Sequence, residues 1–176
     1  MPIDAILLNL DGTIIDSAAL NSLREEGHWQ ECIANITATR CFPYVERVLT
    51  RLRENRIRVG VVTSSVTLYA ERMLRHHCIP CDALIAYHDA RPHKPHPAPI
   101  AACLRRLSVA PERAIGVGDS VEDCEAYVAA GVTSLGAGWN VNLIRTANWH
   151  DIVATPAHLL DYLYLACGDV ADPRRP

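Results

Sequence analysis

Short apolar runs alternate with amphipathic segments along almost the whole chain, and this alternation constrains the fold more than any other feature. The runs are rich in Val, Ile, Leu and Ala, as strands buried on both faces are, and they lie at 5–10, 57–62, 83–86, 114–117, 133–135 and 152–154. Helical patterns occupy 43–55, 66–77, 97–107, 121–130 and 156–165. The alternation predicts an α/β fold with a doubly wound, mostly parallel, Rossmann-like sheet.

Several of the predicted helices have recognisable ends. Ser65, Ser120 and Thr155 each precede a helical segment, so we predict that they are N-caps. Gly131 follows the fourth helical segment, where a left-handed C-terminal cap is expected.

Residues 14–42 interrupt the alternation because they contain no second apolar strand run. The segment predicts one or two short helices and is too small to be a domain of its own. It is either a small cap over the end of the first strand or a plain crossover connection, and the residues leave both readings open. We expect residues 1–176 to form a single domain with this insert at about 14–42.

Composition excludes several classes of protein. The chain is 49% apolar and 21% charged, which is ordinary for a globular protein and unlike a disordered one. No apolar run reaches the ~18–20 residues that cross a bilayer, and no secretory signal begins the chain, so a cytoplasmic protein is expected. A net charge of −3 does not favour nucleic acid as a partner.

The seven cysteines are odd in number and irregularly spaced, which predicts reduced thiols rather than a disulfide framework. Cys78 and Cys81 form a Cys-x-x-Cys pair. The pair fits either small apolar packing or half of a metal or redox site, but no second half follows at zinc spacing.

Polar residues gather directly after four of the predicted strands. Because ligands of such sheets bind at the carboxyl ends of the strands, these residues are expected at one rim. They are Asn9 and Asp11 after the first run, Thr63, Ser64 and Ser65 after the second, Lys94 after the third, and Asp119 and Asp123 after the fourth. Lys94 is the only lysine of the chain.

This set of side chains suits phosphoryl transfer. Several carboxylates at a strand-end rim favour Mg²⁺ over softer metals. A lysine and a hydroxyl beside them can hold phosphoryl oxygens, and the backbone amides of Ser64 and Ser65, at the start of a helix, add an anion site. A metal, a cation and an acid around one centre describe phosphoryl chemistry.

The sequence also resembles the haloacid dehalogenase superfamily, in its phosphoglycolate-phosphatase-like branch. Four family motifs occur in order over nearly the whole chain. Asp-x-Asp-Gly-Thr is matched by 9–13, the strand-end Thr or Ser by Thr63, Lys-Pro-x-Pro by 94–97, and Gly-Asp-Ser-x-x-Asp by 118–123. The resemblance implies a HAD-type sheet with a minimal helical cap.

Roles follow from the resemblance, position by position. Position 9 would be the nucleophile that forms an aspartyl-phosphate and binds Mg²⁺, and Asp11 would be the general acid and base, its carbonyl also on the metal. Thr63 and Lys94 would hold the phosphoryl group. Asp119 and Asp123 would complete the metal site.

The departure from the family lies at the nucleophile, because position 9 is Asn. A carboxamide is a very poor nucleophile, and loss of a covalent nucleophile costs roughly 10⁴–10⁶ in rate. We therefore expect a Mg²⁺-dependent phosphomonoester hydrolase when position 9 carries Asp, and an inactive or impaired one as the chain stands. A deliberately inactivated enzyme and a natural phosphate-binding pseudoenzyme both remain open.

The size of the insert suggests what kind of partner the chain has. Family members with little cap have open sites, which implies a phosphorylated substrate that can be large, or a homo-oligomer that covers the site. Dehalogenation is disfavoured because Asp11 supplies the acid and base that it does not need. A mutase is disfavoured because it needs a larger cap to exclude water.

Overall fold

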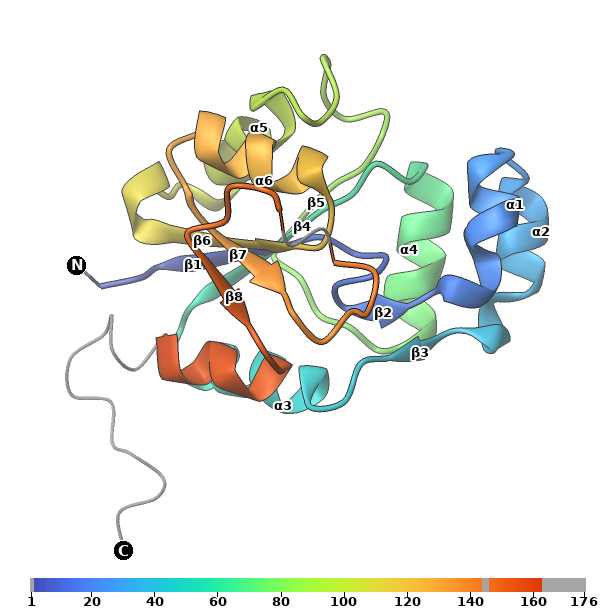
Figure 1. The fold of residues 1–176 in the computed structure, drawn as a ribbon, viewed down its shortest axis with the longest axis horizontal. Helices are drawn as coiled ribbons and strands as arrows, with labels where there is room; N and C mark the ends of the chain where they lie inside the picture. The colour runs from blue at the N-terminus through green and yellow to red at the C-terminus, as the bar shows by residue number, and fades with distance from the viewer. Residues whose placement is uncertain (1, 144–145, 163–176) are drawn as a thin grey trace, which may run out of the picture.

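A computed structural model describes residues 2–143 and 146–162. Six strands form one sheet in the order β5-β4-β1-β6-β7-β8 (Figure 1). They are β1 (Ala5–Leu8), β4 (Arg58–Val62), β5 (Ala83–Ile85), β6 (Ala114–Gly118), β7 (Thr133–Ala137) and β8 (Asp151–Val153). Every neighbouring pair is parallel. The predicted α/β fold with a parallel sheet is confirmed, and β1 lies at its centre.

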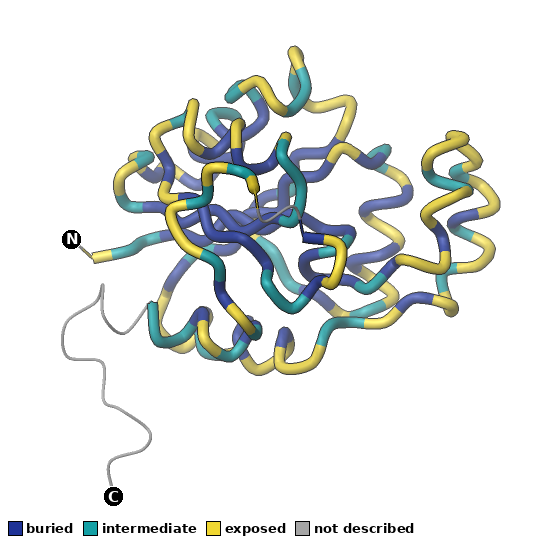
Figure 2. The backbone as a smooth tube through the Cα atoms, in the orientation of Figure 1, coloured by how far each residue is buried: buried dark blue, intermediate teal, exposed yellow. Residues whose placement is uncertain are grey.

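Helices cover both faces of the sheet. They are α3 (Val45–Glu54), α4 (Thr67–His76), α5 (Ala98–Leu107) and α6 (Val121–Ala129). Because side chains alternate along a strand, Ile6 and Leu8 of β1 pack in the core formed with α3 and α4, whereas Ala5 and Leu7 pack in the core formed with α5 and α6. Figure 2 shows the strands buried between these layers.

The predicted strand boundaries hold to within a few residues, and the difference at the first strand is informative. The first strand ends at Leu8 rather than at Leu10, because the amides of Thr13, Ile14 and Ile15 all donate to the carbonyl of Leu10 and form a tight turn. This turn places the residues of the first motif at the edge of the sheet.

The structure confirms some of the predicted helix ends and not others. Ser120 is an N-cap with a full capping box, and Gly131 is left-handed with φ of 75°, so both predictions are confirmed. Thr155 is the N-cap residue of a 3₁₀ turn, as predicted, although its side chain makes no cap bond. Ser65 is not an N-cap, because α4 has Val66 at that position, so this prediction was wrong. The predicted helix at 156–165 begins as the 3₁₀ turn η4 (Pro156–His158), and its last three residues lie outside the described ranges.

The insert contains the predicted short helices and also two strands that the sequence did not predict. β2 (Ile15–Asp16) and β3 (Arg40–Cys41) pair antiparallel at its two ends. Between them lie η1 (Ala18–Leu20), α1 (Asn21–Glu25), α2 (Trp29–Ala34) and η2 (Ile36–Ala38). The sequence did not predict β2 and β3 because each strand has only two residues, too few to show an alternating pattern. In Figure 1 the insert helices stand beside α4, and the rings of Trp29 and Tyr69 lie 5.5 Å apart.

Neither a membrane-spanning helix nor a disulfide is present in the described ranges. Within 2–143 and 146–162, no helix combines the length and the apolar character that crossing a bilayer requires. The six cysteines in those ranges are free thiols, Cys78 and Cys81 among them.

Candidate active site

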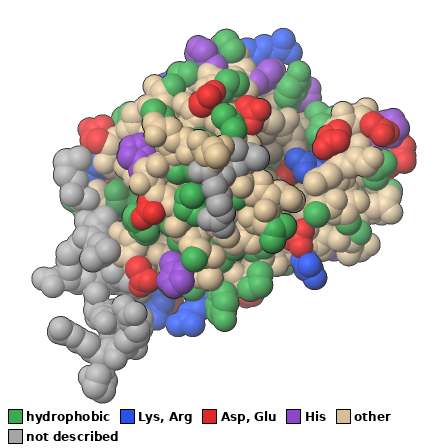
Figure 3. All heavy atoms as spheres, in the orientation of Figure 1, with side chains coloured by type: hydrophobic (Ala, Val, Ile, Leu, Met, Phe, Trp, Pro, Cys, Tyr) green, Lys and Arg blue, Asp and Glu red, His purple; other side chains and the backbone are tan. Residues whose placement is uncertain are grey.

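A cleft of ≈ 870 Å³ opens at the carboxyl ends of β1, β4 and β6. Figure 3 shows acidic and basic side chains gathered where the insert meets the rest of the molecule. Of the eight residues that the sequence places at this rim, all but Ser65 line the cleft, and the Ser65 hydroxyl contacts Asp11 behind it. The seven that line the cleft are Asn9, Asp11, Thr63, Ser64, Lys94, Asp119 and Asp123. They come from four loops that are distant in the chain and adjacent in the sheet.

Asn9 follows β1 and is nearly buried, with 9% of its surface exposed. Its Nδ2 donates to the backbone carbonyl of Asp11 at 2.9 Å and to Oδ1 of Asp119 at 3.0 Å. Its Oδ1 accepts from Nζ of Lys94 at 3.3 Å. The carboxamide therefore connects the first, third and fourth motifs directly.

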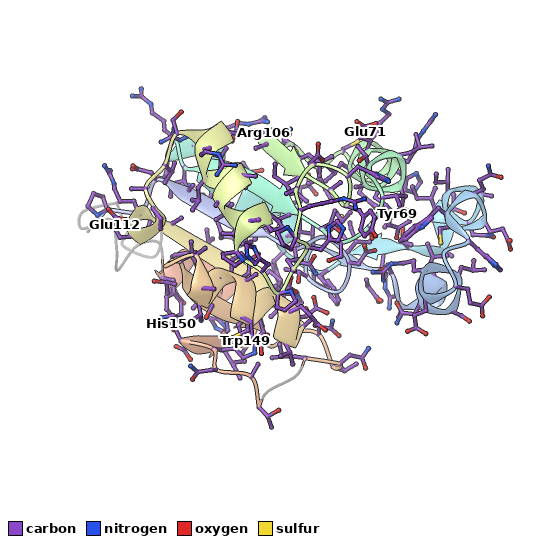
Figure 4. All side chains as sticks on the ribbon, turned by 90° about the horizontal axis from the view of Figure 1, so that it is seen from above. Tyr69, Glu71, Arg106, Glu112, Trp149 and His150 are labelled. Atoms are coloured by element: carbon purple, nitrogen blue, oxygen red, sulfur yellow. The ribbon has the colours of Figure 1, made fainter. Side chains whose placement is uncertain are left out.

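Asp11 directs its carboxylate toward α4 and the insert. Oδ2 accepts from the Ser65 hydroxyl at 2.8 Å and Oδ1 from the Tyr69 hydroxyl at 2.8 Å. The guanidinium of Arg24 lies 3.3 Å from Oδ2. Tyr69 is fully buried and comes from α4 (Figure 4), and burial together with the Asp11 charge raises the pKa of its hydroxyl, which keeps it a donor.

Lys94 and Asp123 form a buried ion pair in which the N···O distance is 2.5 Å and the side chains are 4% and 0% exposed. Nζ of Lys94 also donates to the carbonyl of Val62 at 3.2 Å. The other oxygen of Asp123 accepts from the backbone amides of Asp119 and Ser120. The ammonium thus lies between β4 and the start of α6, with its charge matched.

Asp119 accepts hydrogen bonds from three neutral groups. Its Oδ1 accepts from Asn9 and from the Thr13 hydroxyl at 2.8 Å, and its Oδ2 accepts from Nδ2 of Asn140 at 2.9 Å. Burial, and then the charge of Asp123, raise the pKa of Asp119 to about 6, against the lowering effect of Thr13, Asn9 and Lys94.

Gly12 allows Asp119 to approach the first motif. Its φ is +79°, and a Cβ atom there would lie 2.2 Å from Oδ2 of Asp119 and 2.7 Å from Nδ2 of Asn140. Both the backbone conformation and the available space therefore require glycine.

Thr63 and the serines after β4 differ in one respect from expectation. The amide of Ser65 donates to Oγ1 of Thr63 at 3.1 Å, and α4 begins only at Thr67. That amide is consequently already satisfied, and the predicted pair of free anion-binding amides at Ser64 and Ser65 was wrong as a pair. Ser64 is exposed at the cleft.

Four residues of this site carry no motif signal and were not predicted. Arg24 and Tyr69 contact Asp11 from the insert and from α4. Asn140 donates to Asp119 and to the Gly12 carbonyl, and Nε1 of Trp139 donates to the Thr13 carbonyl at 3.0 Å. The position of Trp139 and Asn140 directly after β7 is the one sequence signal that could have found them, because strand ends define this rim.

The oxygens of this rim are engaged in ways that bear on Mg²⁺ binding. A cation at this rim needs free oxygens that converge on it. The Asp11 carbonyl and Oδ1 of Asp119 are not free, because each accepts a hydrogen bond from Nδ2 of Asn9. Within the described part of the chain, no group of three or more His, Cys, Asp or Glu residues is placed to hold a metal ion. The side chains as arranged do not fit a divalent cation.

Comparison with known proteins identifies the family. The family model described as haloacid dehalogenase-like hydrolase matches residues 24–137, which is more than half of the chain. The chain belongs to this family. The resemblance inferred from the four motifs is therefore confirmed at the level of the haloacid dehalogenase-like hydrolases.

Individual relatives place this haloacid dehalogenase-like hydrolase more narrowly. It is 33% identical to a phosphoglycolate phosphatase of Salmonella paratyphi A and 32% identical to that of Escherichia coli, each over 103 residues and 57% of this chain. This supports the phosphoglycolate-phosphatase-like branch. The chain spans 41% of the length of each of these curated relatives.

The fold is shared with solved structures of the family. CbbY of Rhodobacter sphaeroides, in a mutant form crystallised with xylulose 1,5-bisphosphate, matches with a TM-score of 0.78 at 18% identity. The match covers 89% of this chain and 96% of that one, so the HAD-type sheet is confirmed.

Proposed function

We propose that this rim is a phosphomonoester site of the HAD phosphatase type, and that Asn9 occupies the position of its nucleophile. The observation that carries the proposal is the direct contact of Asn9 with Asp119 and Lys94, since the first, third and fourth motifs of a phosphatase must meet at one phosphoryl group. The relatives named phosphoglycolate phosphatase support the same reaction class.

Each residue then has a role set by its environment. Thr63, Ser64 and Lys94 hold the phosphoryl oxygens, since a hydroxyl and an ammonium are suitable donors to them. Asp11 is the acid and base, and it reaches the ligand when its carboxylate turns from Ser65, Tyr69 and Arg24. With aspartate at position 9, that side chain, the Asp11 carbonyl, Asp119 and Asp123 supply a Mg²⁺ site.

Asn9 impairs this chemistry without removing the binding pocket. A carboxamide cannot form the aspartyl-phosphate, and rate losses on the order of 10⁴–10⁶ accompany the loss of a covalent nucleophile. The CbbY neighbour supports retained binding, because an aspartate-to-asparagine mutant of that protein was crystallised with a bisphosphate.

The test is to restore the carboxylate. Asn9→Asp is expected to hydrolyse p-nitrophenyl phosphate in the presence of Mg²⁺ at a rate roughly 10⁴-fold or more above the unmodified chain. Asn55→Asp is the matched control, because Asn55 is an exposed residue at the end of α3 whose Nδ2 donates only to the Arg51 carbonyl. Equal rates for the two variants would contradict the proposal.

The second candidate function is a phosphate-binding pseudoenzyme on the same scaffold. It is favoured by the tight hydrogen bonding of Asn9, whose two Nδ2 protons and Oδ1 all have partners. The two functions separate in one measurement: an Asn9→Asp variant that binds phosphate but gains no hydrolysis indicates the pseudoenzyme.

The remaining expectations are part of the same proposal. Residues 1–176 act as one domain in the cytoplasm, with 14–42 as a small cap. Because that cap is small, large phosphorylated substrates or a homo-oligomer suit the cleft. On the Asn9→Asp variant, phosphopeptides are expected to be hydrolysed faster than small sugar phosphates, and the reverse order would reject this expectation.

A further inference from the structure

We infer that the Asn9 carboxamide does the structural work of a divalent cation, so that this chain binds its phosphoryl ligand without Mg²⁺. The inference rests on the proposed function and concerns its metal requirement. Nδ2 of Asn9 carries two protons and directs one to the Asp11 carbonyl and the other to Oδ1 of Asp119. It thereby joins the two oxygens that a shared cation would otherwise bring together.

The orientation of the amide follows from its neighbours. Oδ1 of Asn9 faces the ammonium of Lys94, which can only donate. Rotating the amide by half a turn would set Nδ2 against that ammonium and would set Oδ1 against two oxygens that have no proton to give. Turning the Asn9 oxygen toward a cation therefore breaks these three hydrogen bonds. It also places two donors, Nδ2 of Asn9 and Nζ of Lys94, against each other.

The charge balance favours the same conclusion. Asp123 is neutralised by Lys94 at 2.5 Å, and the Asp11 carboxylate is paired with Arg24. Asp119 is the acidic group left facing Asn9, and its oxygens already accept three hydrogen bonds from neutral donors. Relative to a carboxylate at position 9, the pocket has one negative charge less, which weakens attraction for a dication and lessens repulsion of a phosphate dianion.

Binding of inorganic phosphate, measured by titration calorimetry with excess MgCl₂ or with EDTA, tests the inference. For the unmodified chain we expect one dissociation constant in both buffers. For Asn9→Asp we expect phosphate to bind about 10- to 100-fold more weakly in EDTA, the usual scale of a change at a metal site. Asn55→Asp is expected to behave as the unmodified chain does.

Thermal unfolding with MgCl₂ alone gives a second readout. Mg²⁺ is expected to raise the melting temperature of Asn9→Asp and to leave that of the unmodified chain unchanged, since only a ligand of the native state stabilises it. Loss of phosphate binding by the unmodified chain in EDTA, with recovery in MgCl₂, would overturn the inference.

The inference and the proposed function fail in different ways. Hydrolysis by Asn9→Asp supports the phosphatase assignment whatever the metal dependence of the unmodified chain. A Mg²⁺ requirement in the unmodified chain rejects the inference and leaves that assignment intact. Absence of phosphate binding in both buffers rejects the inference.

Discussion

The guanidinium of Arg24 lies 3.3 Å from Oδ2 of Asp11, and this ion pair joins helix α1 of the insert to the turn after β1. Arg24 also donates to Ser17 and Asn21 within the insert. The insert is therefore fixed to the residue assigned here as the acid and base. Any ligand that needs Asp11 must first draw its carboxylate away from Arg24.

Arg24→Met is expected to lower the free energy of unfolding by about 1–3 kcal/mol, because it leaves a buried carboxylate without its counter-charge. Arg40→Met is the matched control: Arg40 pairs with Asp16 from the same insert, but its side chain is 82% exposed, and such pairs contribute about 0–1 kcal/mol. Urea unfolding measures both. Equal losses would mean that burial of the Asp11 pair has no energetic consequence.

Gly12→Ala is expected to destabilise the protein more than Gly27→Ala. Both glycines have positive φ, +79° and +76°, so both variants carry backbone strain of about 1–2 kcal/mol. Only at Gly12 does the new Cβ meet Asp119, at 2.2 Å, which adds about 1–3 kcal/mol of overpacking. At Gly27 the nearest atom is 3.9 Å away. If the two variants lower the urea midpoint of unfolding by the same amount, the close approach of residue 12 to Asp119 is refuted.

The raised pKa of Asp119 predicts a specific pH dependence of stability. Its pKa is about 6 in the folded state against an ordinary 3.8, so between these values the folded state binds more protons. The free energy of unfolding contributed by this group is therefore highest below pH 4 and is lost as the pH rises through about 6. From pH 5 to pH 7 the loss is about 1 kcal/mol.

Asp119→Asn isolates that effect. The stability of the variant should fall less steeply from pH 5 to pH 7 than that of the unmodified chain, in urea unfolding at each pH. If the two chains lose stability in parallel over this range, Asp119 does not titrate as described.

Tyr69→Phe is expected to cost about 1–3 kcal/mol, because it removes a donor from the buried Asp11 carboxylate. Tyr127→Phe is the control, since Tyr127 is equally buried but donates only long bonds, at 3.3 and 3.2 Å, to the carbonyls of Leu7 and Val117. It should lose about 1 kcal/mol or less. If Tyr127→Phe loses more free energy of unfolding than Tyr69→Phe, the hydrogen bond from Tyr69 to Asp11 does not have the stabilising effect expected here.

The sheet was predictable from the sequence because its strands are buried on both faces and read as unbroken apolar runs. The gathering of Asn9, Lys94 and Asp119 followed from one topological rule, that parallel strands share a carboxyl-terminal edge. The same rule does not reveal which donors surround each carboxylate. The contacts of Arg24, Tyr69 and Asn140 depend on side-chain packing between distant segments, which periodicity does not encode.

Ser65 and Ser120 show where local reasoning succeeds and where it fails. Both precede a helical pattern, and both look like N-caps. Ser120 has Asp123 three residues on, so a reciprocal capping box forms within four residues. Ser65 has a buried carboxylate within reach of its hydroxyl and bonds to Asp11 instead. A stronger partner that is distant in sequence overrides the local preference.

The hydrogen bond between Asn9 and Asp119 spans 110 residues. The pocket therefore forms only when β1 has paired with both β4 and β6, which come from the two halves of the chain. Nascent chains, proteolytic pieces and partly unfolded molecules all lack it. With the proposed phosphate site, saturable binding of phosphate would count correctly assembled molecules in a preparation, and would report folding without any need for turnover.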